Sequence, residues 1–387
     1  MREGWEYKKL GQVCTSDLGK TLNKSKDRGE LHPYLCSINI LWDKIDLSTL
    51  KQACFEADEQ EKYTVRKGDL LVCEGGDTGR SAIWDRDETI LYQNALHRLR
   101  FHESVSPKFV LFYLMYLKDI GEIDNKYSKG VTIKHLVKKA LLSIPLPIPP
   151  KSTQLSIVSE LDKLNELIRI KKEQLKDYDT LAQSIFYEMF GDPVVNEKGW
   201  EVKTFGECFS IGAGGTPSTK VKEYWDNGTI PWIGSNMCQN CIITETDGKF
   251  ITEEGLTHSS TKLLAPGTVL VALVGATIGK VGLLRIETCT NQNVAFIKVQ
   301  ETETFTSEFV YYHLMGLYGE FMKIGQGNFK MANQGFIKLL PIPLPPLPLQ
   351  QSFAQKIEQI EQQKAAIQKT ITDLETLLAA RMQYWFD

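Results

Sequence analysis

Two segments of this chain, 196 residues apart, share one pattern: alternating prolines followed by a long run that contains neither proline nor glycine. The first reads IPLPIPP over residues 144–150, and its run extends from 154 to 190; the second reads LPIPLPP over residues 340–346, and its run extends from 350 to 386. Alternate prolines fix φ and remove amide donors, so each proline-rich part must be extended. Each following run is compatible only with a helix.

Apolar residues in both runs recur at alternating steps of three and four over about four heptads, which is typical of a coiled coil. Lys171 and Lys364 lie on this stripe, where they either set the register or reach solvent along their stems. The first helix ends where a second module begins, and the second helix starts from that module, so we expect the pair to be antiparallel. At 1.5 Å per residue each run would be a rod of roughly 55 Å. The predicted core positions are Leu161, Leu164, Ile168, Leu175, Tyr178, Ile185, Met189, Ile357, Ile360, Ile367, Ile371, Leu374, Leu378 and Trp385.

The segments before the two helices are repeated as well. GWEYKKLG at residues 4–11 matches GWEVKTFG at 199–206, and GDLLV at 68–72 matches GTVLV at 267–271. FVLFYLM at 109–115 matches FVYYHLM at 309–315, where we expect a short buried helix. The chain is therefore a tandem duplication of one unit, and we divide it into a first module (1–150), a central helix (151–190), a second module (191–346) and a C-terminal helix (347–387).

Short apolar runs broken by Gly, Asn and Asp, with one or two helices near the end of each module, predict a mixed α/β class in which each module has a twisted β core. The order of module, helix, module and antiparallel helix implies a pseudo-two-fold tandem repeat. Trp5 and Trp200 open the modules, and we expect both to anchor their cores.

Composition excludes few functions, because the formal net charge is −3 and the pI is near 6.2. A nucleic-acid surface would have to be local. The chain has no apolar run long enough to cross a membrane, and its eight scattered cysteines suit reduced thiols, so we expect a cytoplasmic protein. Cys238 and Cys241, completed by Cys208, Cys289 or His258, are a weak candidate for zinc, and we expect no metal site.

Catalytic motifs are absent. The segment GATIGKV at 275–281 is one residue shorter than a phosphate-binding P-loop and has Val in place of the hydroxyl residue that holds magnesium. No glycine-rich dinucleotide turn, His-Glu-x-x-His motif or nucleophile elbow occurs. Two divergent modules on a fixed spacer, without a catalytic centre, favour a recognition subunit that binds a long duplex at two patches.

Taken together, the two GWE openings, the two proline-rich closures with a following Gln, and the two long helices resemble the specificity subunit of type I restriction-modification enzymes. The resemblance covers essentially the whole chain. It implies that each module is a target recognition domain that reads one half of a bipartite, asymmetric site in double-stranded DNA. It also implies that the helix pair sets the spacing and docks two methyltransferase subunits that carry S-adenosylmethionine, while separate restriction subunits use ATP and Mg²⁺.

Residues that contact DNA are predicted from the polar, glycine-rich loops, where side chains supply hydrogen-bond donors. In the first module these are Lys20, Asn23, Lys24, Lys26, Arg28, Ser37, Asn39, Thr78 and Arg80, and in the second they are Gly214, Gly215, Thr216, Ser218, Lys220, Ser235, Asn236, Thr277 and Lys280. Each could equally be a solvated loop residue. Gln93, Asn94, Gln292 and Asn293 correspond across the repeats, and for them we favour a shared structural role.

A partner is expected to bind the outer faces of the helices and the aromatic segment Tyr384-Trp385-Phe386. The alternative function is a non-catalytic protein adaptor with two binding modules on a coiled-coil rod. The second module supports this alternative, because residues 191–346 contain 12 Lys+Arg and 15 Asp+Glu, a net charge of −3.

Overall fold

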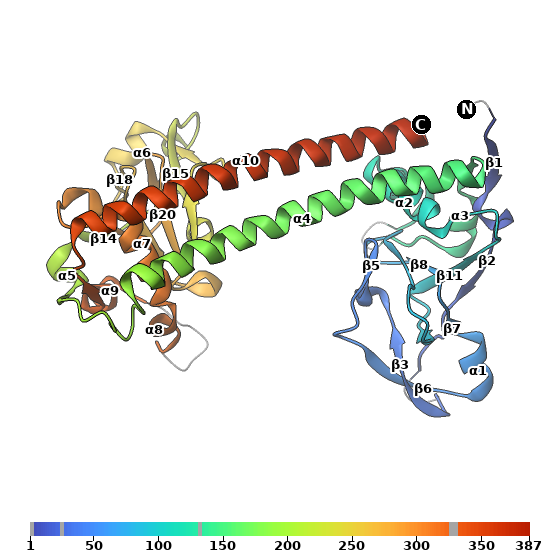
Figure 1. The fold of residues 1–387 in the computed structure, drawn as a ribbon. Coiled ribbons are helices and arrows are strands. Elements are labelled where there is room, and N and C mark those ends of the chain that lie inside the picture. The colour runs from blue at the N-terminus through green and yellow to red at the C-terminus, as the bar shows by residue number, and fades with distance from the viewer. Residues whose placement is uncertain (1–3, 24–26, 131–133, 325–331) are drawn as a thin grey trace. The chain divides into compact units, whose positions relative to one another are not determined.

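The structure, a computed structural model, describes residues 4–23, 27–130, 134–324 and 332–387. It divides into two compact units: Met1–Lys172 with Lys369–Asp387, and Glu173–Gln368. We call these unit 1 and unit 2. Each contains one module together with one half of each long helix (Figure 1).

Unit 1 has a β core of two four-stranded sheets and two short two-stranded pairs. One sheet has the order β6(Lys51–Phe55), β3(Glu30–Leu35), β10(Ile90–Tyr92), β7(Thr64–Val65), and the other has the order β2(Cys14–Leu18), β11(Leu96–Phe101), β8(Leu70–Cys73), β9(Ser81–Ile83). The short pairs are β1(Glu6–Lys9) with β12(Pro145–Ile148) and β4(Ile40–Leu41) with β5(Lys44–Ile45). Its short helices are η1(Leu10–Gln12), η2(Ser37–Asn39), α1(Ala57–Lys62), α2(Pro107–Asp119), η3(Ile123–Tyr127) and α3(Lys138–Ser143).

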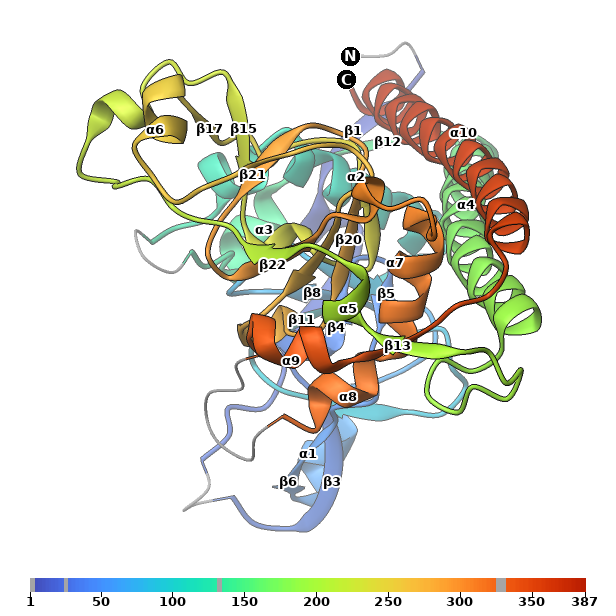
Figure 2. The same ribbon diagram turned by 90° about the vertical axis from the view of Figure 1, so that its left-hand side faces the viewer.

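Unit 2 repeats this architecture. Its sheets have the orders β17(Phe250–Ile251), β15(Ile230–Ile233), β21(Thr288–Thr290), β18(Leu263–Leu264) and β14(Ile211–Ala213), β22(Val294–Ile297), β19(Val269–Ala272), β20(Val281–Leu284), β16(Cys241–Ile243), and its short pair is β13(Val202–Thr204) with β23(Pro341–Pro343). Its short helices are α5(Phe205–Cys208), η4(Lys222–Tyr224), η5(Ser235–Met237), α6(Glu253–Thr257), η6(Gly275–Thr277), η7(Val299–Glu301), α7(Ser307–Gly316), α8(Tyr318–Met322) and α9(Gln334–Leu339). Figure 2 shows α5 and α9 side by side. The predictions of a mixed α/β class and of two repeated modules are confirmed.

The proline-rich segments are extended, as predicted, and each forms a strand with the opening of its own module. Tyr7 lies opposite Pro147 in the first pair, and Lys203 lies opposite Ile342 in the second. Proline has no backbone N–H and cannot donate a hydrogen bond to a neighbouring strand. It is tolerated here because each pair has only two strands. The beginning and the end of each module are thereby fastened together at the point where a long helix starts.

The predicted buried helices are α2 and α7, and each is capped by a hydroxyl side chain. The Ser106 side chain accepts a hydrogen bond from Phe109 N, and the Thr306 side chain accepts one from Phe309 N. A glutamine in the first turn of each long helix lies over the same cap. Gln154 Oε1 accepts from Ser106 N at 2.8 Å, and Gln350 Oε1 accepts from Thr306 N at 3.0 Å.

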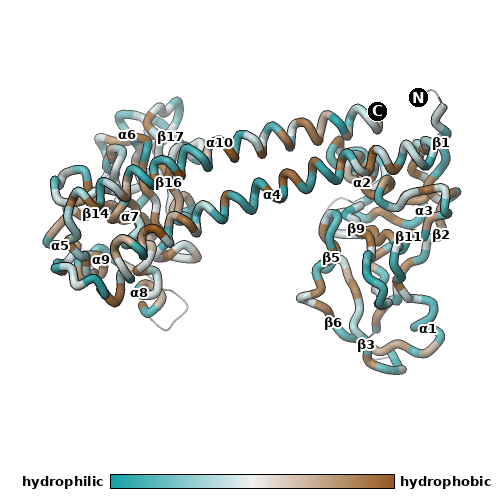
Figure 3. The backbone as a smooth tube through the Cα atoms, viewed as in Figure 1, coloured by the Kyte–Doolittle hydropathy of each residue, from teal (hydrophilic) through white to brown (hydrophobic). Residues whose placement is uncertain are grey.

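The long helices are α4(Lys151–Phe190) and α10(Leu347–Phe386), each three residues longer at its start than the predicted run. Hydrophobic and hydrophilic residues alternate along both helices (Figure 3). All the predicted core positions are buried or partly buried, and Ile157, Ala182, Phe186, Phe353 and Met382 are buried as well.

Contacts within each unit show that the helix segments are antiparallel. In unit 1, Glu160 bonds to Arg381 and Trp385, and further along α4 Lys172 bonds to Glu375 at 2.7 Å. In unit 2, Lys364 bonds to Asp179, and further along α4 Phe186 and Phe190 contact the ring of Phe353. In each case the residue number rises along α4 as it falls along α10.

Candidate nucleic-acid interface

Four loops of unit 2 converge around the short turn η5. Thr216 bonds through its hydroxyl to Gln292 Oε1, and Asn291 N donates to Ile233 O at 3.1 Å. Lys280 Nζ donates to Gln239 Oε1 at 2.7 Å. These bonds join residues 214–220, 234–240, 275–280 and 291–293, and we call this group of segments the unit 2 loop cluster.

The equivalent loops of unit 1 meet in the same way around η2. Asn94 Nδ2 donates to Thr21 Oγ1 at 3.2 Å, and Gln93 N donates to Leu35 O at 2.9 Å. Arg80 Nη2 donates to Ser37 O at 2.8 Å. The unit 1 loop cluster therefore comprises residues 19–23, 36–42, 75–80 and 93–95, and the first three of these segments contain six of the nine residues predicted in the first module.

Charge sets the unit 2 loop cluster apart from its surroundings. The protein has 48 Asp and Glu among 387 residues, yet these four segments contain no carboxylate and carry Lys220 and Lys280. The unit 1 loop cluster contains one carboxylate, Asp77, which pairs with Lys118 at 2.8 Å. A locally uncharged or basic, amide-rich surface on an acidic module is suited to a polyanion.

Several residues predicted to contact DNA lie in the interior of their units. They are Lys20, Asn39 and Thr78, whose side chains are buried, and Gly214 and Gly215, whose Cα atoms lie against neighbouring backbone. Asn39 bonds to Cys36 N and Asp46 O, and Thr78 donates to Asp124 at 2.9 Å. The sequence shows that Lys20, Asn39 and Thr78 are polar but does not show that their side chains bond to partners inside the unit.

Lys20 shows most clearly why a basic loop residue need not face DNA. Its Nζ donates to Cys54 O at 2.7 Å and to Glu59 Oε2 at 2.6 Å, and Asp27 lies at 3.4 Å. Burial lowers the pKa of Lys20, but the bonds and charges of Glu59 and Asp27 outweigh it and the pKa is raised. The ammonium is thus charged and already neutralised.

The remaining predicted residues are exposed or partly exposed: Asn23, Arg28, Ser37, Arg80, Thr216, Ser218, Lys220, Ser235, Asn236, Thr277 and Lys280. Lys24 and Lys26 lie outside the described residues. Gln239, Asn291 and Gln292 belong to the same surface but were missed as candidates. The correspondence of the QN pairs at 93–94 and 292–293 was the available signal.

The aromatic segment at the end of α10 is only partly free for a partner, which corrects the prediction. Phe386 is buried, and its ring lies 5.5 Å from Phe109 and 5.4 Å from Tyr113, measured between ring centroids. Trp385 Nε1 donates to Glu160 Oε2 at 3.0 Å. Tyr384 is the exposed member of the three. The segment closes the core of unit 1.

The cysteine motif also has an interior place. Cys238 is fully buried in the apolar core, and burial raises the pKa of its thiol to about 12. Among the residues that the structure describes, no group of His, Cys, Asp and Glu side chains has the arrangement of a metal site. Within the same residues no helix is both long and apolar enough to cross a membrane.

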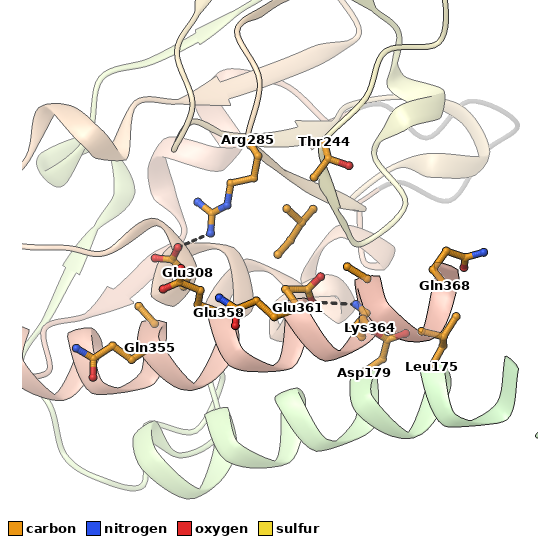
Figure 4. A pocket seen from close by; sticks show the side chains of 14 residues that line it. Leu175, Asp179, Thr244, Arg285, Glu308, Gln355, Glu358, Glu361, Lys364 and Gln368 are labelled. Carbon is orange, nitrogen blue, oxygen red and sulfur yellow. Dashed lines mark hydrogen bonds and ion pairs between the residues drawn. The ribbon is translucent and has the colours of Figure 1, made fainter. Parts of the chain in front are cut away.

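A second candidate surface in unit 2 is a groove of about 820 Å³ between α10, α4 and the module (Figure 4). Its charged lining consists of Asp179, Arg285, Glu308, Glu358, Glu361 and Lys364. Both cations are neutralised: Arg285 pairs with Glu308 at 2.6 Å, and Lys364 pairs with Asp179 at 2.8 Å and with Glu361 at 2.9 Å. The excess of carboxylates makes this groove unfavourable for a phosphate backbone.

The equivalent place in unit 1 is bridged by ion pairs. Lys108 corresponds to Glu308, and its Nζ pairs with Asp43 at 2.6 Å and with Asp162 at 3.2 Å. These bonds join the β4–β5 turn to α4. The two units thus differ in charge and in ion pairing at the same position of the repeat.

Comparison with known proteins gives the same repeat. A model described as "Type I restriction modification DNA specificity domain" matches residues 2–177 and again residues 197–376. The specificity subunit of the type I restriction enzyme EcoR124I/EcoR124II from Escherichia coli is 30% identical over 186 residues, which are 46% of this chain and 44% of that protein. The chain thus spans less than half the length of this relative.

A second relative and a solved structure extend the likeness along the chain. The MjaVIII specificity subunit of Methanocaldococcus jannaschii is 24% identical over 93% of this chain and 86% of its own length. A solved chain from work on complex assembly and conformational transition of the type I R-M system shares the fold, with a TM-score of 0.65, 19% identity and coverage of 100% and 98%. The chain therefore belongs to the family of type I restriction modification DNA specificity domains, of which it carries two copies in tandem.

Proposed function

We propose that this chain is the DNA specificity subunit of a type I restriction-modification complex and acts in the cytoplasm. Each unit reads one half of a bipartite, asymmetric site in double-stranded DNA through its loop cluster. The observation that carries the proposal is the unit 2 loop cluster, in which four segments free of carboxylates converge on an otherwise acidic module. Phosphate contacts position such a protein, and amide side chains can distinguish base edges.

The chain itself is non-catalytic in this proposal. Methylation would be carried out by two methyltransferase subunits that bind S-adenosylmethionine, and restriction subunits would supply ATP- and Mg²⁺-dependent cleavage. The helix pair would dock the methyltransferase subunits and set the spacing between the half-sites.

The direct test is the methylated motif. The chain is coexpressed with the methyltransferase subunit of its host, and methylation-sensitive sequencing reads the modified sites. We expect a split motif, and replacement of residues 1–143 by another module should change one half only. A motif that changes in both halves, or in neither, contradicts the assignment of one half-site to each unit.

Spacing by the helix pair has its own test. One additional heptad in each long helix adds about 10 Å of helix, which corresponds to roughly three base pairs of B-DNA. The spacer of the motif should lengthen while both half-sites stay the same. An unchanged spacer in an active complex would show that the helices do not set it.

The acidic groove of unit 2 favours a protein contact, which keeps the adaptor function as the second candidate. Glu358 faces this groove and makes no ion pair among the described residues. Salt separates the two functions, because the logarithm of DNA affinity falls linearly with the logarithm of salt concentration as phosphate contacts are lost. An adaptor that makes apolar contacts would show no such salt-dependent binding to DNA. It would stay bound to its protein partner at high salt.

A further inference from the structure

The structure places one side chain of each unit at the same exposed position of the repeat, with different chemistry. PYLCS at residues 33–37 matches PWIGS at 231–235, so Ile38 in η2 corresponds to Asn236 in η5. Both are exposed, and Ile38 is 51% exposed. We propose that residues 38 and 236 are matched specificity-determining positions, at which Ile38 contacts a thymine methyl group and Asn236 bonds to the edge of an adenine.

The backbone around the two positions is the same. β3 leads into η2 and β15 leads into η5, and each of these strands pairs in parallel with the strand before the QN corner, β10 and β21 respectively. The turn itself is closed by a bond from Asn39 N to Cys36 O at 3.0 Å in unit 1 and by the equivalent bond from Met237 N to Gly234 O at 3.1 Å in unit 2. The central residue of each short turn is therefore held by a fixed backbone, which a reading position requires.

The Asn236 side chain is available for a ligand. None of the hydrogen bonds of the described residues uses its amide; only its backbone carbonyl accepts, from Gln239 Nε2 at 3.1 Å. A Cβ atom on Gly234 would lie 2.5 Å from Asn236 Oδ1 and 3.4 Å from Asn291 Nδ2, so the glycine leaves room for both amides. An asparagine amide can accept and donate at the same time, which matches the N7 and N6 atoms of adenine in the major groove.

The neighbours of Asn236 are of the kind that a DNA surface needs. Thr216, Gln292 and Lys280 lie in the same loop cluster, with no carboxylate among its four segments to repel phosphates. Ile38 differs from Asn236, because leaving its branched aliphatic side chain exposed to water is unfavourable. An apolar side chain at a base edge can be covered by the C5 methyl group of thymine.

The inference rests on the proposed function, and the test separates the two. The chain in complex with its methyltransferase subunit selects from a library of double-stranded DNA with two randomised half-sites, and the bound fragments are sequenced. Selection of no motif by the unchanged complex overturns the proposed function. Selection of a split motif by the unchanged complex supports the proposed function. The variants then test the roles of Ile38 and Asn236.

We expect Asn236→Ala to lose discrimination at one base pair of one half-site by roughly 5- to 150-fold, the range for one bidentate contact. Ile38→Ala and Ile38→Asn should change one position of the other half-site only. Leu31→Ala removes a similarly exposed aliphatic side chain of unit 1 away from the turn, and Gln359→Ala removes an exposed amide of α10. Both should leave the selected motif unchanged.

Melting curves of each variant show whether it folds as the unchanged chain does, and Asn236→Ser gives a second variant with a smaller change. The inference is overturned if folded Asn236 variants select the unchanged motif, or if Ile38 and Asn236 variants alter the same half-site.

Discussion

The Nε2 atom of His313 donates a hydrogen bond to the carbonyl oxygen of Pro341 at 2.8 Å. Tyr113 occupies the equivalent position in unit 1, and its hydroxyl donates to Pro145 O at the same distance. Each bond fastens a buried helix, α7 or α2, to the proline-rich strand of its unit. The two units thus make the same bond with different groups, an imidazole in unit 2 and a phenol in unit 1.

The buried imidazole of His313 predicts that unit 2 loses stability in mild acid. Burial lowers the pKa of His313 to about 4, although the bond to Pro341 opposes the shift, whereas an unfolded histidine has a pKa of about 6.5. The unfolded state therefore binds the proton more readily, and the stabilisation that is complete above pH 6.5 is lost as the pH falls toward 4, by up to about 3 kcal/mol.

The measurement is the free energy of unfolding of the unchanged chain and of His313→Tyr between pH 7 and 4. The free energy of unfolding of the variant should depend less strongly on pH. A part of the pH dependence should remain, because burial also lowers the pKa of His97. His102→Gln removes an exposed imidazole and serves as the control. An identical slope for His313→Tyr would contradict the assignment.

Gln350→Leu is expected to destabilise unit 2 by roughly 2–4 kcal/mol, because it leaves buried polar groups without partners. Gln350 is fully buried; besides Thr306 N, it bonds through Nε2 to Thr304 O at 3.1 Å and to Pro345 O at 2.9 Å. Gln351→Leu changes the exposed neighbour and should cost less than 1 kcal/mol. Chemical denaturation of both variants tests this. Equal midpoints would show that the buried amide contributes nothing.

Phe386→Ala should destabilise unit 1 by about 3–5 kcal/mol, the usual range for a buried aromatic ring. Its ring also lies 5.7 Å from Tyr116, whose hydroxyl bonds to Asp387. Tyr384→Ala, at an exposed position two residues earlier, should cost about 1 kcal/mol or less. If the segment served only a partner, Phe386→Ala would melt like the unchanged chain and fail only in complex formation.

The helix pair is held mainly by its apolar stripe. Ile371→Ala should cost about 2–4 kcal/mol because Ile371 is buried, while Leu377→Ala at an exposed position of the same helix should cost less than 1 kcal/mol. Glu160→Gln should have an intermediate effect: bonding to Arg381 lowers the pKa of this carboxyl, but the pair is about one-third exposed. Thermal unfolding of the three variants gives the order. If Glu160→Gln lost more stability than Ile371→Ala, the helix pair would not be held mainly by its apolar stripe.

The sequence by itself determined the duplication, the two long helices and the extended proline-rich segments, because these depend on periodicity and on the fixed φ of proline, which are local properties. It also indicated the buried helices α2 and α7. Only the tertiary structure decided that Lys20, Asn39 and Thr78 satisfy interior partners, that Phe386 closes a core, and that Ile38 and Asn236 share one exposed position. Those outcomes depend on contacts between residues far apart in the chain, and burial decides whether a polar side chain serves the fold or remains free for a ligand.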